Sequence, residues 1–214
     1  MMSRSLWTGG TSTVKKRSSP GWLKSKSNAQ PDERLLPTSP EPVAPDVARM
    51  VEVLDRRSVD YLVVGGVATQ AYGANRPTGD FDCLVRQTAE NFERLAIAMR
   101  ELNARLRVHG LTDTEAAELP VQLDALTLSR TEISTWMTDA GALDILIDMP
   151  DRQGRRVGYE GLAGDSRHLA VEGVQVRVAG LAAIIASKEW AARPKDHEAL
   201  DELYRLRDRP VGDS

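Results

Sequence analysis

The period of the apolar residues changes repeatedly along the chain from residue 46 onward. Helical spacing comes first, in a stretch that Asp46 can cap, and its apolar positions are Val47, Met50, Val51 and Leu54. The next run, VDYLVVGG, has the length and composition of a buried strand and stops at a pair of glycines. VATQAYGANR then predicts a short helix followed by a loop, and DFDCLV predicts another strand.

Helices and strands continue to alternate in the second half. TAENFERLAIAMRELNARL predicts a long helix, whose apolar stripe consists of Phe92, Leu95, Met99, Leu102 and Leu106. Residues 108–128 have no regular period and are expected to be irregular and partly helical. EISTWMTDAGALDILIDMP predicts two strands joined by a turn at Asp139-Ala140-Gly141, and VQVRVAG predicts a short strand. Two helices follow, LAAIIASKEWAAR and PKDHEALDELYRLR, the last with Pro194 in its first turn.

This order of elements predicts an α/β (α+β) fold in which a small mixed β-sheet is flanked by helices, with further helices at the C-terminal end. Residues 1–44 differ, because they are rich in Pro, Ser and Lys and have no apolar period. Such a segment buries too little apolar surface to offset the entropy of ordering. We therefore predict a disordered tail over residues 1–44 and one domain over residues 45–214.

The net charge also differs between the tail and the rest of the chain. Residues 1–34 have a balance of +5, and because the whole chain carries −3, residues 35–214 carry −8. The longest uncharged apolar run, Val178 to Ser187, is about half as long as a bilayer-spanning helix. Cys83 is the only cysteine, which excludes an internal disulfide framework. We expect a cytoplasmic protein that does not insert into a membrane.

Candidate chemistry begins in the strand DFDCLV. Residues two apart in a strand point to the same side, so Asp80 and Asp82 share one face and Phe81 and Cys83 share the other. Paired carboxylates repel each other, and a shared divalent cation is the usual reason for such a pair. With a third carboxylate they could hold two Mg²⁺ ions about 4 Å apart. Asp144, in GALDIL, is the best candidate for that third carboxylate, and Asp148 is the reserve.

The glycines Gly65 and Gly66 stand where the first strand turns into a helix. Residues without a Cβ let backbone N–H groups approach phosphate oxygens, which indicates a triphosphate site. The sequence has no GxxxxGK[ST] pattern, which argues against a P-loop enzyme, so a cation must come from elsewhere in the chain.

Taken together, these blocks resemble the nucleotidyltransferase-fold enzymes related to DNA polymerase beta, in which an apolar strand and G-[GS] precede D-x-D. The resemblance is closer to the AbiEii/MenT-type toxins of bacterial toxin–antitoxin systems. Its blocks are GGVA, GANRPTGDFD, GALDIL and SKEWAARPKD, and it extends from Val59 to Leu203.

The resemblance implies a role for each matching residue. Asp80, Asp82 and Asp144 would be metal ligands and, together with Lys188, the catalytic residues. Gly65 and Gly66 would hold the triphosphate, with Lys188 as its countercharge. The resemblance also assigns nucleotide binding to Arg76, Thr78, Arg193 and Asp196, and Lys195 matches a further motif position. In some relatives the hydroxyl two residues before D-x-D is modified to silence the enzyme, which makes Thr78 a candidate for regulatory modification.

By the same resemblance, the chain would be a Mg²⁺-dependent nucleotidyltransferase that uses an NTP as substrate and releases pyrophosphate. The acceptor would be RNA, a tRNA 3′ end, and the protein would be a toxin with a cognate antitoxin protein as partner. The acidic body conflicts with RNA binding, although bound Mg²⁺ and the basic tail offset part of its charge.

Two alternatives remain open. The acceptor could instead be a protein hydroxyl or a small hydroxylated molecule such as an aminoglycoside, since an acidic body suits a polycationic substrate. The chain could also be a nucleotide-binding regulator without turnover, and the intact set of Asp80, Asp82, Asp144 and Lys188 argues against that reading. The sequence does not identify the NTP.

Overall fold

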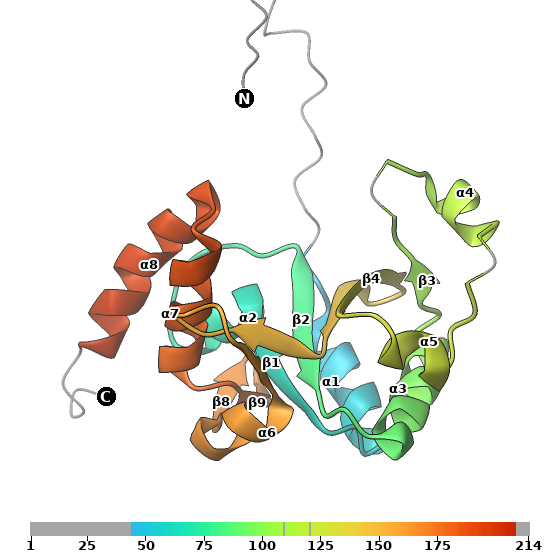
Figure 1. Cartoon of the computed structure of the whole chain (residues 1–214), viewed down its shortest axis with the longest axis horizontal. Coiled ribbons are helices and arrows are strands. Elements are labelled where there is room, and N and C mark those ends of the chain that lie inside the picture. The colour runs from blue at the N-terminus through green and yellow to red at the C-terminus, as the bar shows by residue number, and fades with distance from the viewer. Residues whose placement is uncertain (1–43, 109, 120, 209–214) are drawn as a thin grey trace, which may run out of the picture. The chain divides into compact units, whose positions relative to one another are not determined.

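The structure is a computed structural model that describes residues 44–108, 110–119 and 121–208. Residues 1–43 of the predicted tail lie outside the described residues. Within the described part, a mixed sheet has the strand order β3-β4-β5-β2-β1-β9-β8 (Figure 1). Its strands are β1 (Tyr61–Val64), β2 (Asp80–Val85), β3 (Arg105–Leu106), β4 (Ile133–Thr138), β5 (Gly141–Leu146), β8 (Arg167–Val171) and β9 (Val174–Val178). A separate hairpin consists of β6 (Asp148–Pro150) and β7 (Arg156–Gly158).

The helices flank this sheet, which confirms the predicted fold class. They are α1 (Val47–Arg56), α2 (Gly65–Ala71), α3 (Ala89–Glu101), α4 (Asp113–Ala117), α5 (Ala125–Ser129), α6 (Tyr159–Leu162), α7 (Leu181–Ala191) and α8 (Pro194–Arg207), with a 3-10 turn at Ala163–Asp165. The predicted cap of α1 is present, since the Arg49 amide donates to the Asp46 carboxylate at 2.9 Å. None of the helices in the described ranges combines the length and the apolar character that crossing a bilayer requires.

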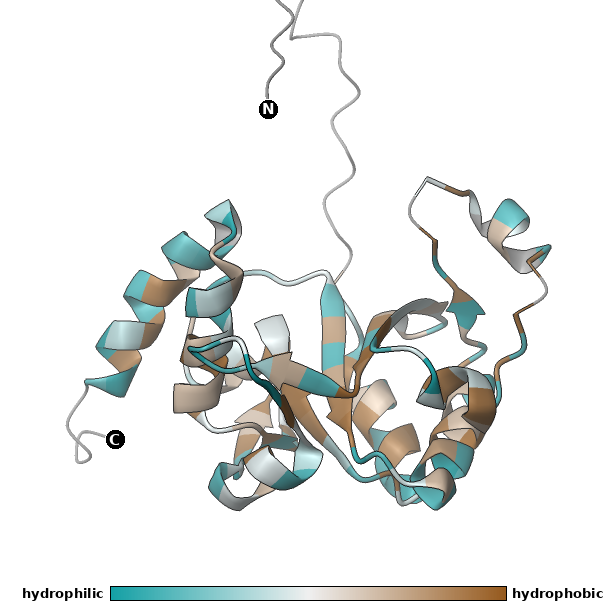
Figure 2. Ribbon diagram, viewed as in Figure 1, coloured by the Kyte–Doolittle hydropathy of each residue, from teal (hydrophilic) through white to brown (hydrophobic). Residues whose placement is uncertain are grey.

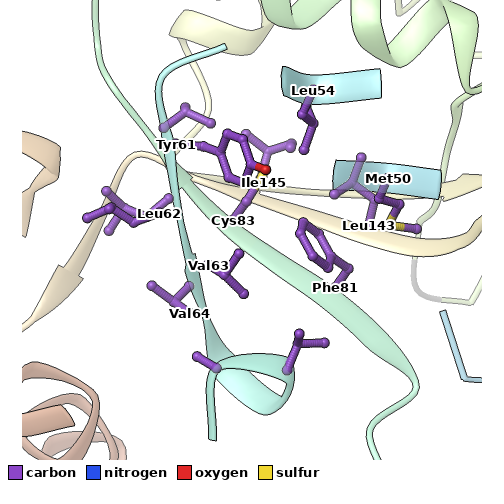
Figure 3. Close-up of a cluster of buried hydrophobic side chains, with 14 of the residues drawn as sticks. Met50, Leu54, Tyr61, Leu62, Val63, Val64, Phe81, Cys83, Leu143 and Ile145 are labelled. Carbon is purple, nitrogen blue, oxygen red and sulfur yellow. The ribbon is translucent and has the colours of Figure 1, made fainter. Parts of the chain in front are cut away.

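The central strand β2 separates an apolar face from a polar one. Phe81 and Cys83 are fully buried, and they pair with Leu143 and Ile145 of β5. Figure 3 shows these side chains beside Met50 and Leu54 of α1. Apolar colour accordingly gathers on the central strands and on the helices against them (Figure 2). Asp80 and Asp82 alternate with these core residues and are only half-buried, so the predicted division of the strand into two faces is confirmed.

The long helix that the sequence predicts through Leu106 is shorter in the structure. It ends at Glu101, and Leu106, assigned to its apolar stripe, lies instead in the edge strand β3. Asn103 has a φ of 51°, in the left-handed region, which a continuing helix cannot adopt. The chain thereby turns, and β3 pairs antiparallel with β4.

Other strands also differ from the prediction. The predicted turn between β4 and β5 is present, but the second predicted strand breaks after Leu146, and Asp148 begins the separate hairpin. The strand β8 was not predicted; it pairs antiparallel with β9, which VQVRVAG did predict. The irregular segment 108–128 contains the short helices α4 and α5, in agreement with its expected partly helical character.

Candidate active site

Three aspartates share the polar face of the sheet. The strands β2 and β5 are parallel, and their register places Asp82 directly opposite Asp144. Asp80 lies two residues earlier on β2, opposite Ala142, and therefore on the same face. The register thus brings the expected third carboxylate next to the D-x-D pair.

The reserve carboxylate, Asp148, is not part of this group. It lies on β6, and its carboxylate forms an ion pair with Arg156 at 2.5 Å. The strand break after Leu146 removes it from the sheet face that carries Asp144. Asp148 is consequently a structural ion-pair residue of the hairpin β6–β7.

The glycine pair makes room for polar side chains of the site. Gly65 has a φ of 62°, and a Cβ built on it would overlap the carboxylate of Asp82. A Cβ on Gly66 would overlap the side chain of Thr78. The two glycines therefore let the start of α2 approach both residues, a packing requirement that comes in addition to the predicted phosphate contact.

Thr78 bridges the glycines and the aspartates. Its hydroxyl donates to the Asp80 carboxylate at 2.9 Å, while its side chain packs against Gly66. The hydroxyl is thus within hydrogen-bond distance of one of the three carboxylates, and any group added to it would contact Asp80 directly.

A cationic cluster stands at the junction of α7 and α8. The carboxylate of Asp196 has no solvent exposure, and it accepts hydrogen bonds from Lys188 Nζ at 3.3 Å and from Arg193 Nε at 2.6 Å. Burial raises the pKa of the Asp196 carboxyl, but the hydrogen bond from Arg193 and the charge of Lys188 outweigh it and leave that pKa below its usual range. Asp196 thereby fixes both cations.

The same cluster reaches the D-x-D pair. The pKa of the Arg193 guanidinium is raised, chiefly by its hydrogen bond to Asp196 and by that carboxylate's charge, with further contributions from Asp82 and Asp80. Arg193 therefore lies within electrostatic range of both aspartates. The Arg193 side chain is 57% exposed, whereas that of Lys188 is 17% exposed.

Arg76 forms an ion pair with the last helix. Its guanidinium pairs with Glu198 of α8 at 2.9 Å, and its carbonyl accepts a hydrogen bond from Gln70 of α2 at 2.8 Å. It links the loop before β2 to α8. The side chain of Lys195, which matches a further motif position, lies outside the described part.

The donor chemistry of the three aspartates suits a hard cation such as Mg²⁺, which prefers carboxylate oxygens. In the ranges 44–108, 110–119 and 121–208, however, no group of three or more His, Cys, Asp or Glu side chains is gathered closely enough to hold a metal ion. Asp80 accepts from Thr78, and the Asp82 carboxylate packs against Gly65. The residue types and the face fit a metal site, while the side chains are engaged with protein groups.

Register also brings residues to this face that the sequence analysis did not single out. Thr135 of β4 pairs with Asp144, and the amide of Arg107 donates to the Thr135 carbonyl at 2.9 Å. The prediction of a helix through Leu106 hid this relation. The charged–apolar alternation of Arg105-Leu106-Arg107-Val108 was the available signal for a strand.

No protein-family model and no curated protein matches the sequence. Among solved structures, the lincosamide antibiotic adenylyltransferase LnuA, with lincomycin bound, matches with a TM-score of 0.50 at 13% identity, over 75% of this chain and 96% of that chain. The antibiotic-resistance factor ANT(2'')-Ia gives 0.49 at 19% identity, over 75% of this chain and 79% of that chain. A putative nucleotidyltransferase from Thermotoga maritima gives 0.43 at 14% identity, over 76% and 91%.

The likeness to the lincosamide adenylyltransferase shows that the chain has the nucleotidyltransferase fold. The fold implied by the glycine pair and the D-x-D motif is therefore confirmed. The closer resemblance to AbiEii/MenT-type toxins stays a prediction, as do the roles of the individual site residues.

Proposed function

We propose that this protein is a nucleotidyltransferase that moves the NMP group of an NTP to an acceptor hydroxyl. The observation that carries the proposal is the register of β2 and β5, which sets Asp82 opposite Asp144 beside the Gly65 turn, with Asp80 on the same face. Carboxylates at adjacent strand positions are costly unless they share a cation or a proton. The confirmed fold and this cluster support the same reaction.

The reaction is a single displacement. The acceptor oxygen forms a bond to the α-phosphorus, the bond from that phosphorus to the bridging oxygen breaks, and pyrophosphate leaves with the electron pair. Asp144 accepts the hydroxyl proton, since a carboxylate within hydrogen-bond reach of a nucleophile can act as general base. Asp80 and Asp82 would hold Mg²⁺ with Asp144. When bound, Mg²⁺ would supply charge stabilisation at the reacting phosphate.

The triphosphate would be held between the glycine turn and the cationic cluster. Backbone N–H groups at Gly65 and Gly66 can donate to phosphate oxygens. Lys188 and Arg193, whose side chains Asp196 holds in place, supply positive charge near the aspartates. Arg76 and Thr78 complete the set that the sequence motif assigns to the nucleotide.

Label transfer tests this function. Purified protein would receive each NTP labelled at the α-phosphate together with Mg²⁺, total RNA, cell protein and an aminoglycoside. We expect label on one acceptor class with the wild type and none with Asp82→Ala. Label transfer that persists in Asp82→Ala, with the variant folded, would refute the assigned site.

For the acceptor, we infer an RNA 3′ end, and specifically tRNA. The support is the four motif blocks in their order between Val59 and Leu203. On this inference the protein is a toxin that blocks translation, and a cognate antitoxin protein neutralises it. The labelled band in the experiment above identifies the acceptor, and co-purification with a neighbouring gene product would identify the partner.

A second acceptor class is favoured by charge. Residues 35–214 carry −8, which attracts a polycation. The structural neighbour with lincomycin bound is named as an antibiotic adenylyltransferase. A small hydroxylated cation such as an aminoglycoside is therefore the second candidate, and label on that compound instead of RNA would establish it.

Thr78 is proposed as a regulatory modification site. A phosphate on its hydroxyl would place negative charge beside Asp80, which now accepts the hydrogen bond of that hydroxyl at 2.9 Å. Such charge would repel the carboxylate and exclude the NTP. Mass spectrometry of protein co-produced with its partner would reveal the added mass, and an unmodified Thr78 peptide in an inactive preparation would argue against this role.

A further inference from the structure

Two arginines on the edge strand β3 share the face of the sheet that carries the aspartates. Paired residues on neighbouring strands project their side chains to the same side. The pairs Asp82 with Asp144 and Asp144 with Thr135 define a row across β2, β5 and β4. Arg107 extends this row, because Leu106 pairs with Trp136 and the Arg107 amide bonds to Thr135.

A second, parallel row ends in the other arginine. Asp80 pairs with Ala142, and Ala142 pairs with Met137. Met137 in turn pairs with Arg105. Arg105 and Arg107 therefore lie on the aspartate face at the far edge of the sheet, two strands away from Asp144. Neighbouring strands are about 4.8 Å apart, so roughly 10 Å separates the backbone of Asp144 from that of the arginines.

The guanidinium groups of these arginines are available to a ligand. The Arg105 side chain is 57% exposed, and the nearest carboxylate oxygen, that of Asp139, is 4.0 Å away. Arg107 is exposed, and among the described residues it has no ion-pair partner. Other arginines of the acidic body are tied more closely, as in the pairs Arg86 with Glu160 at 2.6 Å and Arg155 with Asp151 at 2.7 Å.

The place of the arginines fits the acceptor and does not fit the triphosphate. Gly65 follows directly on Val64, which pairs with Asp82 from the β1 side. The arginines lie on the opposite side of the aspartates, beyond β5 and β4 (Figure 1). In an in-line displacement the nucleophile and the leaving group occupy opposite sides of the reacting phosphorus. With pyrophosphate on the glycine side, the acceptor approaches from the side of β3.

We propose that Arg105 and Arg107 bind backbone phosphates of a single-stranded RNA acceptor whose terminal hydroxyl reaches Asp144. The proposal rests on the nucleotidyl transfer proposed above and deepens it by assigning the acceptor's path across β5, β4 and β3. The side chains that lie between, Thr135 and Met137, are half-buried. The Thr135 hydroxyl also donates to the Arg107 carbonyl at 2.8 Å, which fixes the edge strand.

The test is RNA binding by the full chain without NTP, so that it does not depend on turnover. A fluorescein-labelled oligoribonucleotide with a free 3′ hydroxyl would be titrated by anisotropy at several salt concentrations. The double variant Arg105→Gln/Arg107→Gln would be compared with the wild type. The control is Arg49→Gln, an equally polar change on α1, which covers the opposite face.

We expect the double variant to bind RNA roughly tenfold more weakly at low salt, with the slope of log affinity against log salt reduced by about 0.7 per arginine. Arg49→Gln should match the wild type. NTP affinity should not change in either variant, because the triphosphate lies on the other side of the aspartates. An unchanged slope in the double variant, or a wild type that does not bind RNA, overturns the proposal.

The possible outcomes distinguish failure of this proposal from failure of the proposed nucleotidyl transfer. If the wild type transfers label to a small molecule but does not bind RNA, the acceptor path is wrong while nucleotidyl transfer stands. If the arginines govern RNA binding but no NTP label reaches any acceptor, the transferase function fails while the RNA surface stands. Thermal unfolding of each variant checks that it is folded, since exposed substitutions usually change the free energy of unfolding little.

Discussion

At the scale of single residues, the site depends on close contact between glycine backbone and acidic side chain. Gly65 adopts a φ of 62°, and its α-carbon faces the Asp82 carboxylate with no room for a methyl group. The sequence motif predicts that this glycine binds phosphate. The structure shows in addition that the absence of a side chain at this position leaves the space that the Asp82 carboxylate occupies.

We therefore predict that Gly65→Ala inactivates the protein more than it destabilises it. The added Cβ displaces Asp82, and misplacing a reacting group by about 1 Å costs on the order of 100-fold in rate. The left-handed backbone adds a destabilisation of about 1 to 2 kcal/mol. Rate measurements and urea unfolding would check this. Gly164→Ala, where a Cβ meets nothing within 4 Å, is the control and should leave both properties unchanged.

The buried Asp196 carboxylate gives a second residue-scale prediction. Asp196→Asn keeps the shape but removes the charge that holds Lys188 and Arg193, so we expect a loss of about 2 kcal/mol in the free energy of unfolding. We also expect weaker NTP binding. Asp201→Asn, on an exposed position of the same helix, should change neither. Unfolding and NTP titration would measure the two effects, and wild-type NTP affinity in Asp196→Asn would contradict the assigned role.

The pH dependence of this cluster follows from the lowered pKa of Asp196. A carboxyl whose pKa is depressed on folding contributes stability above its unfolded pKa, which is about 3.9, and loses that contribution as the pH falls through the folded value. The contribution of Asp196 should consequently be constant at neutral pH and disappear only below about pH 4. In Asp196→Asn, the free energy of unfolding measured against pH should lack the loss that protonation of Asp196 causes in the wild type.

At the scale of elements, the junction of α3 and β3 shapes the open face of the sheet. Apolar spacing alone continued the helix to Leu106, because helix and strand patterns both fit the short run after Leu102. The left-handed Asn103 ends the helix and allows Arg105 to pair with Met137. Tertiary pairing with β4 decides the conformation there, because the alternation from Arg105 to Val108 is too short to outweigh the helical spacing before it.

Substitutions at Asn103 test this junction. Asparagine tolerates the left-handed region better than most residues, so Asn103→Val should destabilise the protein by about 1 to 2 kcal/mol. Asn103→Gly should cost less, because glycine adopts a positive φ readily, although it loses the hydrogen bond from the Asn103 amide to Asp139 at 2.5 Å. Urea unfolding would rank the two variants, and equal stability of both would show that the positive φ does not constrain this turn.

At the scale of the whole molecule, the sequence predicted the elements that carry the motif better than the elements around it. The strand DFDCLV has the predicted bounds, and GALDIL supplies the aspartate opposite it. Local periods are strong there because both strands bury one full face. The edge strands β3 and β8 and the break before Asp148 escaped prediction, since short, half-exposed strands leave little apolar signal.

The distribution of charge is the other whole-molecule feature. The net charge of −8 over residues 35–214, considered alone, argues against RNA binding. In the structure, many of the acidic side chains form ion pairs with arginines. Examples are Glu160 with Arg86 and Glu189 with Arg152. The cations Lys188, Arg193, Arg105 and Arg107 lie at the two flanks of the aspartates. Cationic side chains therefore lie close to the site, although the net charge of residues 35–214 is negative.

The most direct test of the proposed reaction compares NTP labelled at the α-phosphate with NTP labelled at the γ-phosphate in the same acceptor mixture. Nucleotidyl transfer predicts that the α-label reaches the acceptor and that the γ-label appears only in pyrophosphate. Asp144→Asn should abolish the transfer, while Asp148→Asn, in the separate hairpin, should retain it. The γ-label on the acceptor, or full activity in folded Asp144→Asn, would contradict the account.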